Sequence, residues 1–162
     1  MSLTKIVSYA LSGLVILWFG CSKKQEITVP EIILEKKMTK LISNDEAVKV
    51  IDELHGLDVA PEKNIIAEYG TDEKDLLYIS RYHSEDQASE AFKLMINKMI
   101  ESDNGPFTHI QALPDYEGQV YISIGMGAIH YIFSSTRYVL WLQTYQEIGR
   151  ELPDNLLKLY PL

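Results

Sequence analysis

The clearest hydrophobic pattern in the chain lies between residues 84 and 106. Ser84 and Gln87 have the spacing of a capping box, in which the serine hydroxyl accepts a hydrogen bond from a backbone amide of the first helical turn. The sequence Asp103-Asn104-Gly105-Pro106 then supplies residues that end helices. Apolar residues recur between these signals at spacings of three and four: Ala88, Ala91, Phe92, Met95, Ile96 and Met99. This pattern predicts an amphipathic helix.

Two further helices are expected. Ser43 and Glu46 form a second capping box, and the helix that follows is expected to stop at Gly56. One face of this helix carries Ala47, Val50, Ile51 and Leu54. Residues 147–160 favour a terminal helical segment that is begun or interrupted at Pro153.

Alternating apolar and polar positions, separated by turn residues, predict antiparallel strands. The expected strands are 64–69, 76–82, 107–113, 120–124, 128–133 and 138–143. The first two form a hairpin across Gly70-Thr71-Asp72, and the last three are joined by turns at Gly125-Met126-Gly127 and at 134–136.

The segment before Ser43 gives weaker signals. Residues 22–30 have no helical periodicity and end at Pro30, so they predict an extended tether. Apolar residues between 32 and 42 have mixed spacing that suits a short helix or a strand, and we favour the helix. The expected organisation is therefore a tether with a short helix over 21–42 and one globular domain over 43–162.

The order of these elements predicts an α+β fold. We expect an antiparallel sheet of five or six strands with two or three helices packed on one face. Its β-β-α-β-β core is loosely similar to the ferredoxin-like plan, an analogy that carries no function.

The first 21 residues have the layout of an export signal. Lys5 provides a short charged region, Ile6–Leu17 an apolar one, and Gly20 the small residue that precedes Cys21. This segment resembles a bacterial lipoprotein signal peptide, in which residues 1–20 are removed and the cysteine is lipidated. The resemblance implies that Cys21, the single cysteine of the chain, carries diacylglycerol and a further acyl chain such as palmitate. Two or more acyl chains hold a protein stably on a membrane.

Other interpretations of this segment fit less well. An uncleaved spanning helix over residues 6–21 would have 16 residues, fewer than the roughly 17 to 25 that a bilayer requires. Trp18 is a poor residue two positions before an ordinary secretory cut. Ser22 after the cysteine, in place of Asp, resembles lipoproteins sent to the outer membrane of diderm bacteria. The expected location is a bacterial membrane, with the domain facing the periplasm or the extracellular side.

Charge divides the chain unevenly. Residues 22–42 hold five lysines against three glutamates, whereas from Ser43 onward nine Lys and Arg residues face 20 Asp and Glu residues. A strongly acidic domain repels phosphate backbones, because nucleic-acid binding depends on clustered basic side chains. Nucleic acid is therefore an unfavoured partner.

Catalytic signatures are weak. His83, His109 and His130 fall on or beside predicted strands, but no pair has a spacing typical of zinc ligands, so we expect no metal or other cofactor. Gly125-Met126-Gly127 joins two strands and does not open a helix, as a phosphate loop would. Asp115 and Glu117 flank a turn, and no nucleophile elbow of the Gly-x-Ser-x-Gly type occurs.

Aromatic residues gather in the last three strands. Side chains with an apolar body and a polar tip are common at binding surfaces, and they also fill cores by packing across strands. The candidate partner surface consists of Tyr121, Tyr131, Tyr138, Trp141 and Tyr145.

The leading hypothesis is a lipid-anchored envelope domain that binds a protein or small ligand without catalysis. One alternative is a small envelope enzyme or metal-dependent hydrolase that uses His83, His109 or His130 with nearby carboxylates. The other is a self-associating structural or assembly subunit.

Overall fold

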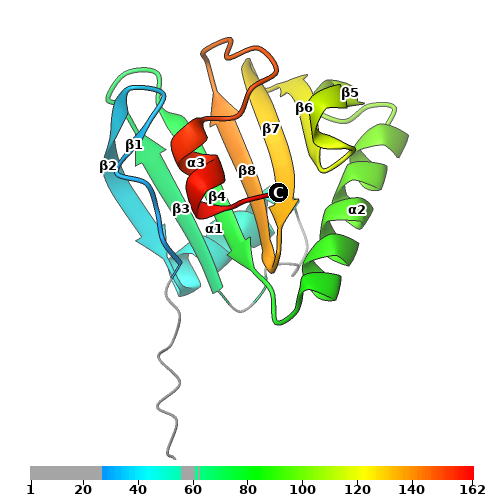
Figure 1. Ribbon diagram of the computed structural model, residues 1–162, viewed down its shortest axis with the longest axis horizontal. Coiled ribbons are helices and arrows are strands. Elements are labelled where there is room, and N and C mark those ends of the chain that lie inside the picture. Colours follow the sequence, from blue (N-terminus) through cyan, green and yellow to red (C-terminus); the bar gives the residue numbers. More distant parts are fainter. Residues whose placement is uncertain (1–26, 56–60, 62) are drawn as a thin grey trace, which may run out of the picture.

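The computed structural model describes residues 27–55, 61 and 63–162. These residues form one antiparallel sheet of eight strands in the order β1-β2-β3-β4-β8-β7-β6-β5, which curls like part of a barrel (Figure 1). The strands are β1 (Ile32–Ile33), β2 (Lys36–Ser43), β3 (Lys63–Tyr69), β4 (Asp75–Arg81), β5 (Phe107–Ala112), β6 (Val120–Gly125), β7 (Ala128–Ser135) and β8 (Tyr138–Thr144).

The described helices are few and lie on both faces of the sheet. They are α1 (Asp45–His55), α2 (Glu85–Glu101), α3 (Asp154–Leu159) and the 3₁₀ turn η1 (Pro114–Tyr116). In Figure 1, α3 lies in front of the sheet, α1 lies behind it and α2 runs along the side that carries β5 to β8.

Strand alternation explains why both faces are covered. On β7, Tyr131 and Phe133 point to the face where α3 contributes Leu156 to the largest core cluster. Ile132, between them, points to the opposite face and packs with Phe92 of α2. A third cluster joins α1 to β2 and β3 on that second face. A sheet buried on both sides needs apolar residues at consecutive positions, and β7 has them.

Several local expectations are confirmed. The Ser84 hydroxyl accepts a hydrogen bond from the Gln87 amide at 3.2 Å and caps α2, which ends at Glu101, before Asp103-Asn104-Gly105-Pro106. The hairpin of β3 and β4 forms across Gly70, whose φ of 83° suits a glycine. The strands expected near residues 107, 120, 128 and 138 also form.

The expected fold class is wrong. The sheet has eight strands, the protein is mostly β, and its helices are not confined to one face, so the ferredoxin-like analogy also fails. The missing strands are β1 and β2, in the segment where we expected a short helix. Their hairpin turns at Leu34 and Glu35, which have φ of 48° and 64° without the Gly or Asn that normally marks such a turn.

The chain from residue 27 to residue 30 lies against the domain. The Tyr69 hydroxyl donates a hydrogen bond to the Pro30 carbonyl at 2.8 Å, and the Tyr160 hydroxyl donates one to the Thr28 carbonyl at 2.5 Å. Ile27 and Val29 pack against the largest core cluster. This stretch, expected as part of a tether, is therefore fixed to the folded domain.

Candidate functional site

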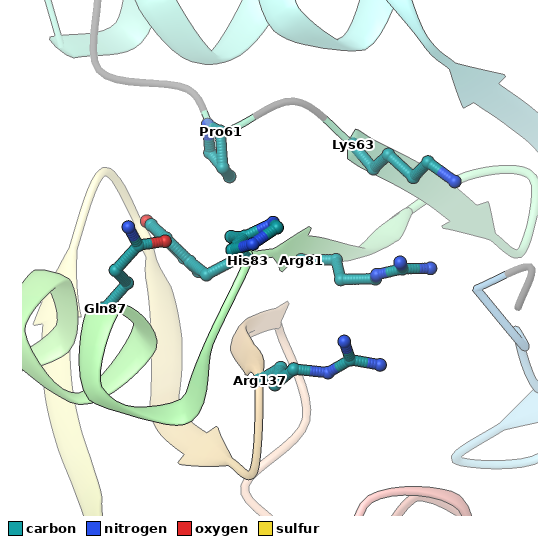
Figure 2. A pocket seen from close by; sticks show the side chains of 7 residues that line it. Pro61, Lys63, Arg81, His83, Gln87 and Arg137 are labelled. Carbon is teal, nitrogen blue, oxygen red and sulfur yellow. The ribbon is translucent and has the colours of Figure 1, made fainter.

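A basic hollow lies at one end of the sheet. It has a volume of about 410 Å³ and opens between the start of β3, the end of β4, the turn from β7 to β8 and the first turn of α2 (Figure 2). The described residues that line it are Pro61, Lys63, Arg81, Tyr82, His83, Gln87 and Arg137.

Strand register brings the three strong cations together. Lys63 pairs with Arg81 across β3 and β4, and Arg81 pairs with Tyr138 across β4 and β8. Arg137 precedes Tyr138 in the turn, where its carbonyl accepts a hydrogen bond from the Tyr82 amide at 2.8 Å. Figure 2 shows the Lys63, Arg81 and Arg137 side chains extending in the same direction.

The hollow is suited to an anion. None of its described lining residues is acidic; Glu62, between Pro61 and Lys63 in the sequence, lies outside the described residues. Two guanidinium groups, an ammonium group and the Gln87 amide offer hydrogen-bond donors, and guanidinium groups bind phosphate or carboxylate in a bidentate manner. Burial raises the pKa of Tyr82, so its hydroxyl stays protonated at neutral pH. The described lining residues therefore offer mainly donors for an anion.

A second cluster of polar groups surrounds His130 inside the sheet. The His130 Nε2 atom lies 2.9 Å from the Gly125 carbonyl, and the Trp141 indole donates to Nδ1 at 2.8 Å. Because a carbonyl only accepts, Nε2 carries the proton and the ring is neutral. Burial lowers the pKa of His130, although its hydrogen bond to the Gly125 carbonyl acts in the opposite direction.

This cluster does not have the geometry of a nucleophile and its base. Ser123 lies directly opposite His130 in the register of β6 and β7, and both residues are buried. However, both ring nitrogens of His130 are engaged elsewhere, and the Ser123 hydroxyl has no hydrogen-bond partner within the described part of the chain. A base must hydrogen-bond to the nucleophile that it activates. His130 therefore serves as a packed core residue, with the Phe107 ring 5.0 Å from its own.

The five aromatic residues of the candidate partner surface are divided between the two faces of the sheet. Tyr131 is fully buried in the cluster beneath α3, and Tyr138 packs against that cluster. Tyr121 and Trp141 pack against α2 on the opposite face. Tyr145, which is 43% exposed, follows the end of β8. The structure does not bring the five side chains into one patch.

The three histidines are likewise separate. His83 is exposed and lines the basic hollow, His109 is exposed in the irregular part of β5, and His130 is buried in β7. Among the described residues, no group of three or more His, Cys, Asp or Glu side chains has an arrangement that could hold a metal ion. Gly125-Met126-Gly127 forms the turn between β6 and β7, as expected.

The sequence reasoning missed the basic hollow. Lys63, Arg81 and Arg137 lie far apart in the chain, and no other Lys or Arg lies within five positions of any of them, so no local run of basic residues marks them. Only the cross-strand register, which a single sequence does not specify, unites them. Cys21 and the signal segment of residues 1–20 lie outside the described residues.

No protein-family model, curated protein or solved structure matches the chain. None of the helices in the described residues has the length and apolar character needed to cross a bilayer.

Proposed function

We propose that this chain is a lipid-anchored protein of a bacterial envelope, with a non-catalytic binding domain. The observation that carries the proposal is the sequence Ile6–Leu17 followed by Gly20 and Cys21, which has the layout of a lipoprotein signal. Attachment of two or more acyl chains to Cys21 would hold the domain on the membrane. The domain would face the periplasm or the extracellular side, and Ser22 favours the outer membrane of a diderm cell.

Two features of the domain support binding over catalysis. The basic hollow presents cations and an amide group, and its described lining residues include no Ser, Thr or Cys side chain that His83 could activate as a nucleophile. The buried Ser123 and His130 lie side by side, yet His130 has no free ring nitrogen to accept a proton from the serine. An anionic partner fits this arrangement better than a covalent reaction does.

Metabolic labelling with palmitate in a bacterial host tests the anchor. We expect the full chain to incorporate label, and globomycin, which blocks lipoprotein signal cleavage, to cause a larger precursor to accumulate. Cys21→Ala should abolish labelling, because no other side chain of the segment can form the thioether. Ser22→Ala is the matched control and should label normally. Labelling of the Cys21→Ala chain at the normal level would refute the proposal.

A further inference from the structure

The described chain begins at the same end of the sheet as the basic hollow. The Thr28 carbonyl is bound by the Tyr160 hydroxyl, and the Tyr160 ring lies 5.0 Å from the Tyr138 ring. Tyr138 pairs with Arg81 and follows Arg137. In Figure 1 this is the lower end, where the blue start of the chain, the end of β4 and the turn from β7 to β8 all lie.

The chain between a lipid on Cys21 and this end is short. Six residue steps separate Cys21 from Ile27. A fully extended chain covers about 3.5 Å per residue, so the lower end would stay within about 20 Å of the bilayer surface. That distance is an upper limit, so the domain can approach the headgroups, and charge attraction acts once the hollow lies within about one Debye length, about 8 Å at physiological salt.

The hollow is positively charged, whereas the rest of the domain is strongly acidic. From Ser43 onward acidic residues outnumber basic ones by 20 to nine, yet Lys63, Arg81 and Arg137 gather at the end where the described chain begins. Glu85 and Asp86, in the first turn of α2, lie near this end and reduce the attraction. Asp86 lines a separate groove on the outer side of α2. An anionic surface would repel most of the domain and attract this end, which fixes its orientation.

The attraction of three basic side chains to an anionic membrane is sufficient to dock a domain that is already anchored there. A basic side chain near an anionic membrane raises the affinity about fivefold. Three such residues would bind a free protein weakly, but an anchor makes docking intramolecular and raises the effective concentration. Arg81 and Arg137 already interact with other parts of the protein. A guanidinium group has five N–H donors, so each arginine can bind a phosphate as well.

From these observations we infer that the domain docks through the basic hollow on the anionic phospholipid headgroups of the membrane that carries its anchor. Arg81 and Arg137 bind headgroup phosphates, and Lys63 and His83 flank them. The inference rests on the proposed lipid anchor and adds the orientation of the domain and the chemistry of its partner.

Lysine acetylation footprinting of the full lipidated chain in vesicles tests the inference. One set of vesicles contains phosphatidylcholine alone and the other contains about 30% phosphatidylglycerol, whose charge is the variable. We expect the acetylation rate of Lys63 to fall about fivefold on the anionic vesicles and to recover in about 0.5 M NaCl, which screens the attraction. Lys93 and Lys158, exposed on α2 and α3, should react equally on both vesicles.

Variants identify the groups responsible. Arg81→Gln with Arg137→Gln should abolish the protection of Lys63. The matched control, Lys93→Gln with Lys98→Gln, removes the same charge from the exposed side of α2 and should leave the protection intact. Because both arginines also interact within the protein, Arg81→Lys with Arg137→Lys separates charge from fold, and we expect it to retain most of the protection.

Several results would overturn the inference. Equal Lys63 rates on neutral and anionic vesicles would exclude docking by headgroup charge. Protection in detergent by inorganic phosphate alone, to the same extent, would instead indicate a site for a free anion. Retained protection in the Gln pair would exclude the arginines. The mass of the N-terminal peptide in the same samples separates failure of docking from failure of the anchor, since only the latter leaves Cys21 unmodified.

Discussion

His130 illustrates how a buried side chain can fix one protonation state. Both ring nitrogens are used, one toward the Gly125 carbonyl and one by the Trp141 indole. A proton added at Nδ1 would face the indole N–H and break that hydrogen bond. Burial also disfavours the charged ring and lowers the pKa of His130. The folded protein therefore favours the neutral ring.

This arrangement predicts a pH-dependent stability. The unfolded chain protonates His130 near its ordinary pKa, whereas the folded chain protonates it only at lower pH. The contribution of His130 to the free energy of unfolding should therefore be constant above about pH 7 and fall as the pH drops below about 6.5, by at most about 1.4 kcal/mol per pH unit. The decrease should level off once the pH lies below the folded pKa. Urea unfolding between pH 8 and pH 5 measures it.

Variants assign the effect. His130→Gln should remove this part of the pH dependence along with some stability; His109→Gln, at an exposed position, is the matched control. An unchanged profile in the His130→Gln chain would contradict the assignment.

Asp75 is a buried carboxylate whose charge must be balanced by a nearby cation. Its side chain is fully buried, and its Oδ1 atom lies 3.1 Å from the Lys36 ammonium group. The Oδ2 atom has no hydrogen-bond partner within the described residues. Removal of one partner from a buried pair leaves an uncompensated charge, which costs more than the pair itself contributes.

We therefore expect Lys36→Met to lower the free energy of unfolding by about 3 kcal/mol or more. Lys40→Met on the same strand is the matched control. Lys40 is exposed and its Nζ atom lies 3.7 Å from Glu68 Oε1. Loss of this pair should lower the free energy of unfolding by less than about 1 kcal/mol. Chemical denaturation of both variants measures the difference. Equal losses would show that the burial of Asp75 does not determine the strength of the pair.

At the scale of elements, the sequence predicted those helices and strands whose signals lie within one short stretch of the chain. Helix α2 has its cap, its periodicity and its stop within one stretch of sequence, and it forms where we expected it. Strand β2 has one buried position in eight, so it shows no alternation to distinguish it from a helix. Its hairpin partner β1 has only two residues, and the turn between them lacks glycine. The number of strands could not be obtained from such signals.

The segment that leads into β1 depends on two tyrosines far away in the sequence. Tyr69 and Tyr160 are buried and donate their hydroxyl protons to the carbonyls of Pro30 and Thr28. Burial raises the pKa of both tyrosines, so the hydroxyls remain donors throughout the physiological range. These bonds fix the point at which the chain enters the domain.

Loss of these hydroxyls should loosen the entry point. Tyr160→Phe and Tyr69→Phe should each lower the free energy of unfolding by about 0.5 to 1.5 kcal/mol. Hydrogen exchange of the amides between residues 27 and 34 should become faster, while the amides of α2 exchange as before. Tyr145→Phe, at an exposed position, is the control. Unaltered exchange over 27–34 in both variants would show that the two hydrogen bonds do not hold the segment.

The candidate site forms only at the scale of the whole molecule. Composition predicts an acidic domain. The net charge of the domain does not reveal the basic hollow, which forms where β3 pairs with β4 and β4 pairs with β8. The aromatic residues near the C-terminus form an evident group in the sequence, yet alternation divides them between two cores. Groups adjacent in sequence are thus separated in space, and the cations far apart in sequence are brought together. This result follows from the period of two along a strand and from a register that spans the sheet.

The proposed docking of the basic hollow on headgroups requires that the chain be anchored beside it. The whole account therefore depends on whether the Cys21 thiol carries a lipid. Mass spectrometry of the N-terminal peptide, taken from the protein in its native membrane, measures that state directly. We predict a peptide that starts at Cys21 and carries the added mass of diacylglycerol and a further acyl chain. A peptide that retains Met1, with the Cys21 thiol unmodified, would contradict the account.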